Sequence, residues 1–263
     1  HRLVVISHGS RGSDLGHHDL AEYLARNGIV VAAPRHLGDS SDQPRSSGGQ
    51  QFVTRPWQIV ATLDAVLSDP RLRDIIDAGR VGIAGFSAGG YTALVIAGAK
   101  PRFELWLAHC ADHPDDRELC EGMPPPGVPV PLPTGKLPEE TRIRAAVAMA
   151  PLGVVFDAPG LATIGIPLRV YAAAHDQVLV NAWNAEHVSG CCHGRRRTRQ
   201  CPAVTMFSWR PARRLRRRPR HSCASTHRAS IAPPFTRRST QRSWISSIAL
   251  LALDDPGQKA DSV

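Results

Sequence analysis

The sequence has no long hydrophobic run, since none of its apolar stretches reaches the roughly eighteen residues that a membrane-spanning helix needs. It also lacks a recognisable signal peptide and an initiator Met before its first apolar segment, so we expect a fragment or a processed form of a longer product. With 263 residues, of which 42% are hydrophobic, the chain is long enough for one large globular domain with a sizeable core. We therefore expect no membrane span.

Lysine is scarce, and the charges are unevenly distributed. Residues 1–188 carry 16 Lys and Arg against 20 Asp and Glu, a net charge of −4, whereas residues 189–263 carry 16 against 3, a net charge of +13. All but one of the cations in the second part are Arg. Such an asymmetry indicates two parts of different character. We treat residues 1–188 as a folded core and residues 189–263 as an Arg-rich tail.

The core alternates between short apolar segments and helical patterns. Helical spacing of apolar residues predicts helices over residues 17–28, 57–69 and 88–99. Buried strands are predicted at Leu3–Ser7 and over residues 29–34, 81–85, 143–151 and 166–176. Strands that alternate with helices predict an α/β fold with a mostly parallel sheet covered by helices on both faces.

A proline-rich insertion interrupts this alternation over about residues 101–141. So much proline lies between His113 and Pro138 that we expect no regular structure there, but a surface excursion or a lid over the functional site. Cys110 and Cys120 are ten residues apart in the insertion. A disulfide between them would brace the insertion and would favour a periplasmic or secreted location, whereas two free thiols would suit the cytoplasm.

The segment Gly85-Phe86-Ser87-Ala88-Gly89 matches the pattern G-x-S-x-G, with a predicted strand before it and a predicted helix after it. In that context a serine occupies a tight turn that exposes its hydroxyl oxygen at the end of the strand. The alternative interpretation is a glycine-rich turn without chemistry. The flanking elements favour Ser87 as a nucleophile.

Backbone donors for an oxyanion are expected at two strand ends. The helix that begins after Ser87 directs the N–H of Ala88 and its positive dipole end at a developing negative charge. The earlier segment "SHGSRG" follows the first strand, and the backbone N–H of Ser10 is the second candidate donor. The alternative for this segment is an ordinary polar loop. We expect His8 to be structural, because it precedes the nucleophile in the chain.

The acid and the base of a triad should follow the nucleophile, in the order Ser, acid, His. Asp176 lies at the end of the last predicted strand of the core and is the candidate acid, whereas His175 beside it would point away. Four later histidines could supply the base, namely His187, His193, His221 and His227. None of them lies at a predicted strand end that is followed by a helix.

These residues resemble the α/β-hydrolase superfamily, and most of all the bacterial group described as predicted dienelactone hydrolases. The resemblance covers about residues 2–188 and rests on the segments "VVISHGSRGS", "LAEYLARNGIVVAAP", "GFSAGGYTAL", "RAAVAMAP" and "IPLRVYAAAHD". It implies an eight-stranded hydrolase fold, here incomplete at the N-terminus and disrupted at the C-terminus, and hydrolysis of an ester or lactone without a cofactor.

The sequence departs from this family at two places. True dienelactone hydrolases have a Cys nucleophile where this chain has Ser87, so their substrate is not carried over. The family often has an Asp or a similar residue after the second strand, where this chain has Arg35 and His36. The cysteines at positions 191, 192, 201 and 223 lack the spacing of a zinc site, so we expect no metal.

The composition of the tail is that of GC-rich coding DNA read in a wrong frame, because it combines many Arg and almost no Lys with Pro, Ser, Cys and Trp. With GC-rich synonymous codons, a frame moved back by one base after about Val188 converts Val204–Pro211 into a segment containing Gly-Asp-His. The histidine of that segment is encoded by bases shared between Thr205 and Met206. As written, we expect the tail to be mostly disordered, with the apolar stretch Trp244–Leu253 able to dock.

Two functions follow from these observations. The first is a serine hydrolase acting on a small carboxylic ester or lactone, impaired here if the tail is genuine. The second is a non-catalytic binding protein, in which a hydrolase-like core carries a basic arm that binds nucleic acid. The scarcity of Lys argues against nucleic acid as the partner.

Overall fold

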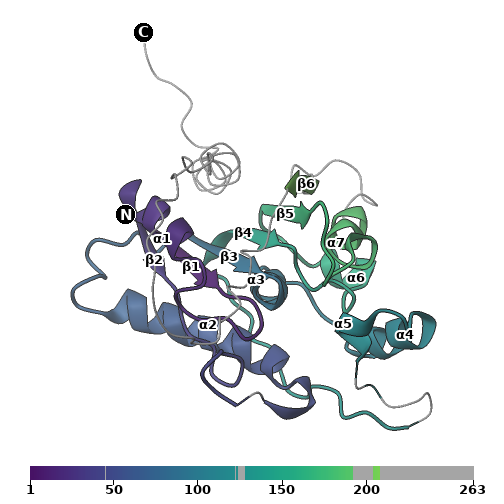
Figure 1. Ribbon diagram of the computed structural model, residues 1–263. Helices are drawn as coiled ribbons and strands as arrows, with labels where there is room; N and C mark the ends of the chain where they lie inside the picture. The colour runs from purple at the N-terminus through teal and green to yellow at the C-terminus, as the bar shows by residue number, and fades with distance from the viewer. Residues whose placement is uncertain (45, 122, 124–127, 192–203, 208–263) are drawn as a thin grey trace, which may run out of the picture.

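A computed structural model describes residues 1–44, 46–121, 123, 128–191 and 204–207 of the chain. Within these residues, six parallel strands form a single sheet in the order β2-β1-β3-β4-β5-β6, shown in Figure 1. The strands are β1 (Arg2–Ser7), β2 (Ile29–Ala32), β3 (Val81–Phe86), β4 (Ile143–Met149), β5 (Leu168–Ala173) and β6 (Val204–Phe207). The predicted α/β class with a parallel sheet is confirmed.

Side chains that alternate along each strand divide the core between the two faces of the sheet. Leu3 and Val5 of β1 belong to a large cluster together with apolar residues of three helices, α2 (Gln51–Ser68), α3 (Ala88–Ile96) and α7 (Ala185–Cys191). Val4 and Ile6 belong to a smaller cluster with α1 (His18–Arg26). Helices therefore cover both faces, as predicted. In the part of the chain that the structure describes, no helix has both the length and the apolar character that crossing a membrane requires.

Helix α2 begins at Gln51, six residues before the predicted start, and continues through Pro56. Proline has no N–H, so the carbonyl oxygen of Phe52 lacks the donor that a helix normally provides four residues later. The Tyr91 hydroxyl of α3 donates a hydrogen bond to this oxygen at 3.1 Å. A tertiary contact thus compensates for the proline, which local sequence patterns could not show.

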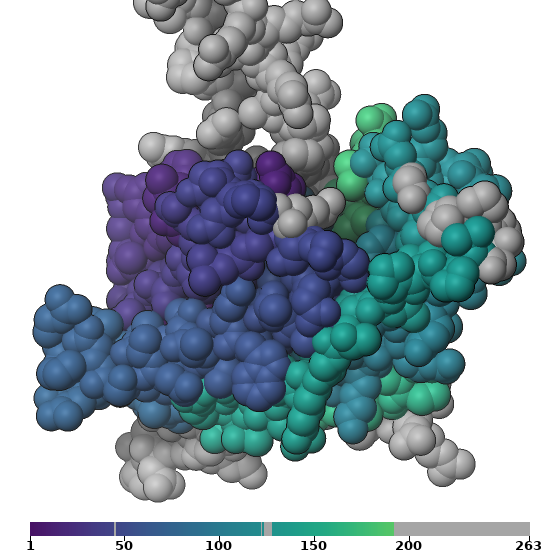
Figure 2. All heavy atoms as spheres, turned by 90° about the horizontal axis from the view of Figure 1, so that it is seen from below, coloured from purple at the N-terminus to yellow at the C-terminus, as the bar shows by residue number. Residues whose placement is uncertain are grey.

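The insertion contains regular structure, contrary to the prediction. It forms α4 (Glu104–Asp112) and α5 (Arg117–Cys120), and the second of these lies within the stretch expected to be irregular. Beyond the helices, the proline-rich segment lies along α2, as Figure 2 shows for the teal atoms beside the blue ones. Gln50 Nε2 and Trp57 Nε1 bind it by hydrogen bonds to the carbonyl oxygens of Thr134 at 2.9 Å and Lys136 at 2.8 Å.

Four residues of the tail form a strand at the edge of the sheet. Val204–Phe207 form β6, whose register pairs Val170 with Val204 and Ala173 with Phe207. Helix α7 also continues to Cys191, past the boundary set at residue 188. The expected disorder of the tail, the docking of Trp244–Leu253 and three of the candidate base histidines concern residues outside the described part of the chain.

Candidate active site

Ser87 lies at the junction of β3 and α3 with backbone angles of φ 56° and ψ −118°. A residue other than glycine in such a conformation costs on the order of 1–3 kcal/mol and persists only where its surroundings hold it. Two backbone hydrogen bonds do so here: the Ser87 N–H donates to Met149 O at 2.9 Å, and the Leu152 N–H donates to Ser87 O at 3.2 Å. The side chain is half-buried at the carboxyl edge of the sheet, where α/β proteins gather functional groups.

The two glycines of the motif are required by the closeness of the backbone on either side of Ser87. A Cβ atom on Gly85 would lie 1.9 Å from the carbonyl oxygen of Gly89, and a Cβ on Gly89 would lie 2.0 Å from the carbonyl oxygen of Ser7. Neither position can accommodate a side chain without moving backbone atoms. The sequence pattern therefore encodes a sharp turn that packs the start of α3 against the end of β1.

The start of α3 and the loop after β1 lie side by side, as a pair of oxyanion donors requires. Ala88 supplies the first N–H of α3, and the first N–H groups of a helix have no acceptor within the helix. On the other side, a Cβ on Gly9 would lie 3.1 Å from the Phe86 ring and 3.5 Å from the Phe86 carbonyl oxygen. Ser10, the second predicted donor, directly follows Gly9.

Asp39 holds the turn that contains Ser10. Its carboxylate oxygen Oδ1 accepts hydrogen bonds from the Ser10 hydroxyl at 2.8 Å and from the Arg11 N–H at 3.3 Å. Its carbonyl oxygen accepts from the same Arg11 N–H at 3.2 Å. Arg11 has a positive φ of 57°, a conformation that a residue other than glycine rarely adopts.

Arg55 of α2 lies behind this turn and pairs with Asp39, with both side chains fully buried. Its guanidinium donates to Asp39 Oδ2 at 2.7 Å, Thr92 Oγ1 at 3.2 Å, Ser7 Oγ at 3.4 Å and the carbonyl oxygen of His8. Burial lowers the pKa of Arg55 to about 10, and Asp39 partly offsets this effect. The guanidinium thus stays charged at neutral pH and connects β1, α3 and the loop after β2.

Two buried histidines are part of the same network. His8 Nε2 accepts a hydrogen bond from the His36 N–H at 3.0 Å, so the other ring nitrogen carries the proton that binds Gly9 O at 2.7 Å. His36 lies between Ser7 Oγ at 2.8 Å and Gln58 Oε1 at 2.9 Å. Burial, together with the nearby Arg55 charge, lowers the pKa of His36 to about 2. His36 is therefore neutral at physiological pH.

Asp176 lies three residues beyond the end of β5, in the position expected of a triad acid. Its Oδ1 accepts hydrogen bonds from the N–H groups of Val178 at 3.0 Å and Leu179 at 2.9 Å. These bonds fix the orientation of the half-buried carboxylate. His175 beside it is exposed.

One candidate base, His187, forms a hydrogen bond away from Ser87 and Asp176. His187 of α7 has its Nε2 within 2.8 Å of the carbonyl oxygen of Phe156, which requires a proton on that nitrogen. His193, His221 and His227 are among the residues that the structure does not describe. The chain has no histidine between His193 and His221. Because Phe207 pairs with Ala173 in a parallel register, the chain leaves β6 at the sheet edge where Asp176 lies.

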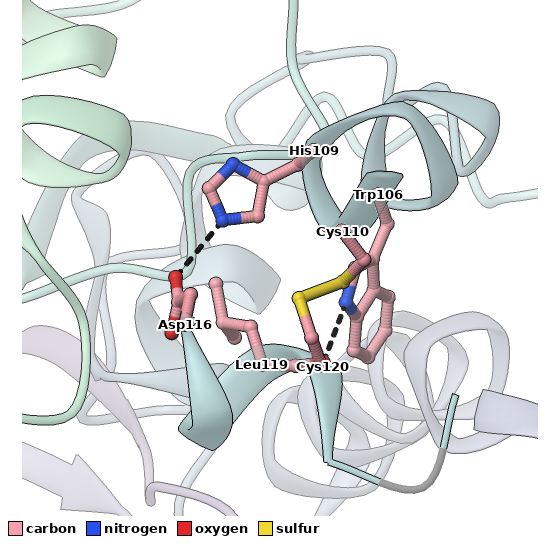
Figure 3. Close-up of a disulfide and its surroundings, with 6 residues drawn as sticks. All are labelled: Trp106, His109, Cys110, Asp116, Leu119 and Cys120. Atoms are coloured by element: carbon pink, nitrogen blue, oxygen red, sulfur yellow. Dashed lines mark hydrogen bonds and ion pairs between the residues drawn. A yellow bond between two sulfur atoms is a disulfide. The ribbon is translucent and has the colours of Figure 1, made fainter. Parts of the chain in front are cut away.

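The insertion packs beside the segment that follows Asp176. Figure 3 shows the Cys110–Cys120 disulfide, with the Trp106 indole donating to the Leu119 carbonyl oxygen at 2.9 Å across it. The same view shows His109 directed at Asp116, with 2.9 Å between Nε2 and Oδ2. The Trp183 ring lies 4.8 Å from the ring of His109, so the helical part of the insertion adjoins the loop of the candidate acid.

Sequence reasoning missed Asp39, Arg55 and the buried role of His36. A lone Asp in a polar loop and a lone Arg before a proline carry no distinctive signal. Asp39 lies in the loop after β2, seven residues beyond the end of that strand, where no sequence pattern indicated its buried pairing. Within the described residues, no cluster of three or more His, Cys, Asp or Glu could hold a metal ion.

No protein-family model matches the chain, and no curated protein shows significant similarity to it. The fold places the chain among α/β proteins with a parallel sheet. Any assignment of function consequently depends on the geometry of the residues described above.

Proposed function

We propose that the protein is a serine hydrolase that acts on small carboxylic esters or lactones, with an α/β-hydrolase fold. The observation that carries the proposal is the conformation of Ser87, a strained non-glycine residue held between Gly85 and Gly89. Strain of this kind concentrates at functional sites, and the strand-turn-helix context is that of a nucleophile elbow.

In the proposed reaction, the Ser87 hydroxyl oxygen attacks the carbonyl carbon of the ester while a histidine accepts its proton. The backbone N–H groups of Ala88 and Ser10 stabilise the oxyanion, and the alcohol leaves with the proton returned by the histidine. Water then hydrolyses the acyl-enzyme by the same route. Asp176 orients the histidine, which we place on the segment that follows β5.

The base is the part of the triad that remains unassigned, since within the described residues no histidine forms a hydrogen bond with Ser87 or Asp176. We propose that the frame-restored chain, in which translation moves back by one base after about the codon for Val188, supplies this histidine. A hydrolase that lacks one triad member still exceeds the uncatalysed rate by about 10³–10⁴-fold, through its oxyanion hole and substrate binding. The 263-residue chain should therefore retain a weak esterase activity.

A fluorophosphonate probe tests the nucleophile directly, because it forms a covalent bond with activated serines. Trypsin should release Ser87 in the peptide 81–102, since Lys100 is followed by Pro101. We expect the probe mass on this peptide of the frame-restored chain, and slower labelling of the 263-residue chain. Ser87→Ala should abolish the label. A label on another serine, or none in the frame-restored chain, would refute the assignment.

A further inference from the structure

The buried ion pair of Asp39 and Arg55 makes more hydrogen bonds to other residues than an ion pair alone requires. A buried ion pair generally adds little net stability, because desolvation of both charges offsets their attraction. Here the two side chains are 0% exposed, yet most of their remaining hydrogen bonds go to the residues around the candidate oxyanion hole. This distribution of partners suggests a role in the reaction.

The partners of the pair lie on both sides of the site. Asp39 binds the Ser10 hydroxyl and the Arg11 N–H, on the turn that carries one candidate donor. Arg55 binds the His8 carbonyl oxygen on the same turn and Thr92 on α3, the helix whose first N–H is the other donor. The distance between the two donors thus depends on one guanidinium and one carboxylate.

The turn needs such support because its backbone is strained at Arg11, with φ 57°. The Arg11 N–H donates to both the carbonyl and the carboxylate oxygen of Asp39, which holds the residue in this conformation. Rotation of the Arg11 peptide out of this geometry would also rotate the adjoining Ser10. Misplacement of a catalytic group by about 1 Å can cost about a hundredfold in rate.

We propose that Asp39 and Arg55 are positioning residues for the reaction, which together hold the Ser10 N–H at the oxyanion relative to Ala88. The proposal rests on the proposed function. It assigns neither residue a contact with substrate. It predicts that weakening the pair lowers kcat with little change in KM, because an oxyanion donor acts mainly in the transition state.

Asp39→Asn is the sharpest substitution, because an Asn side chain has the same shape but one acceptor oxygen in place of two. Either Arg55 or the Ser10 turn then loses its partner. The matched control is Asp42→Asn, the same change three residues away, where Asp42 forms an exposed pair with Arg35 at 2.6 Å. Ser10→Ala is a second variant, which keeps the ion pair and the Arg11 N–H bond and removes only the hydrogen bond from the Ser10 hydroxyl to Asp39.

The experiment uses the full 263-residue chain and two measurements. Hydrogen exchange of the amides in residues 8–12 should be about tenfold faster or more in Asp39→Asn than in the wild type, with β4 unchanged. Hydrolysis of p-nitrophenyl acetate above the uncatalysed rate should show kcat reduced about ten- to a hundredfold, and KM within about threefold. Ser10→Ala should shift both readouts in the same direction by less, and Asp42→Asn should shift neither.

The outcomes separate this inference from the function on which it rests. If the wild type hydrolyses the ester faster than the uncatalysed rate and Asp39→Asn does so with the same kcat, the positioning role is wrong. If Asp39→Asn does not fold, an unchanged Ser10→Ala overturns the inference equally. If the wild type gives no rate above the uncatalysed reaction, the proposed function fails. Unchanged hydrogen exchange of residues 8–12 in Asp39→Asn would then show, in addition, that the pair does not hold the turn.

Discussion

Gly89, the second residue of α3, lies directly against the carbonyl oxygen of Ser7 at the end of β1, and a Cβ atom at this glycine would be 2.0 Å from that oxygen. The contact joins the two strand ends that carry the candidate nucleophile and the candidate oxyanion turn. It is a contact between backbones, so no change of side-chain rotamer could relieve a clash there.

Gly89→Ala should therefore destabilise the protein by about 3 kcal/mol or more, at or above the upper end of the usual cost of overpacking a core. The measurement is urea unfolding followed by circular dichroism. Gly165→Ala is the matched control, because a Cβ at Gly165 meets nothing within 4 Å, and it should change stability by less than about 1 kcal/mol. Equal effects of the two substitutions would contradict the close packing at the elbow.

Stability should depend on pH through His36. Burial lowers its pKa from 6.5 to about 2 in the folded protein, so between these values the unfolded chain binds a proton that the folded protein does not. The free energy of unfolding should accordingly fall as pH is lowered below about 6.5, by up to about 1.4 kcal/mol per pH unit from this residue, and should be unaffected by it above that pH. Burial also lowers the pKa of His8 and His17 and acts in the same direction.

The His36 contribution is isolated by comparing the wild type with His36→Asn between pH 5 and 6, where most carboxylates are already ionised. Asn does not titrate, so the slope of the free energy of unfolding against pH should be smaller in the variant by about 1 kcal/mol per pH unit. Identical slopes would show that His36 titrates normally in the folded protein.

Much of the fold was predictable from the sequence because the strands are continuous apolar runs bounded by turns. β1, β3 and β5 fall where the patterns place them. The helix start at Gln51 was missed because Pro56 normally ends a helix; in the structure the distant Tyr91 hydroxyl satisfies the Phe52 carbonyl oxygen that Pro56 leaves without a donor. β6 was missed because Val204–Phe207 is too short for a recognisable alternation, and its pairing with β5 is a tertiary effect.

In the candidate site, the parts that a short local motif encodes could be predicted from the sequence. Ser87 and its glycines form a pattern within five positions, so the elbow was visible without the structure. The link between Asp39 and Arg55 joins residues 16 apart through a fully buried contact, and no local pattern encodes it. The disulfide was suggested by spacing alone, and the structure joins Cys110 to Cys120.

The disulfide should form in protein produced in an oxidising compartment. Trypsin cleaves after Arg117, between the two cysteines, so a digest without reductant should contain the peptides 103–117 and 118–136 joined by a disulfide. Cys191, which is free in the structure, should be alkylated in the same sample and serves as the control. Alkylation of both Cys110 and Cys120 in this material would contradict the bridge and remove the main reason for an exported location.

The frame-restored chain should be more soluble and more active than the 263-residue chain. Loss of one triad member typically lowers kcat by about 10⁴–10⁶-fold, so we expect restoration of the base to raise p-nitrophenyl ester turnover by several orders of magnitude. Sequencing the gene around the codon for Val188 provides an independent check. High activity of the 263-residue chain would instead require His193, His221 or His227 as the base, and steeply salt-dependent DNA binding would favour the nucleic-acid-binding alternative.

The nucleophile is the central claim, and the kinetics of Ser87→Ala in the frame-restored chain test it most directly. Removal of the hydroxyl should lower kcat for p-nitrophenyl acetate by at least about a thousandfold, while the circular dichroism spectrum and the urea midpoint stay close to those of the parent. A folded Ser87→Ala variant that keeps more than about a tenth of the parent kcat would contradict the account, because a serine hydrolase cannot dispense with its nucleophile.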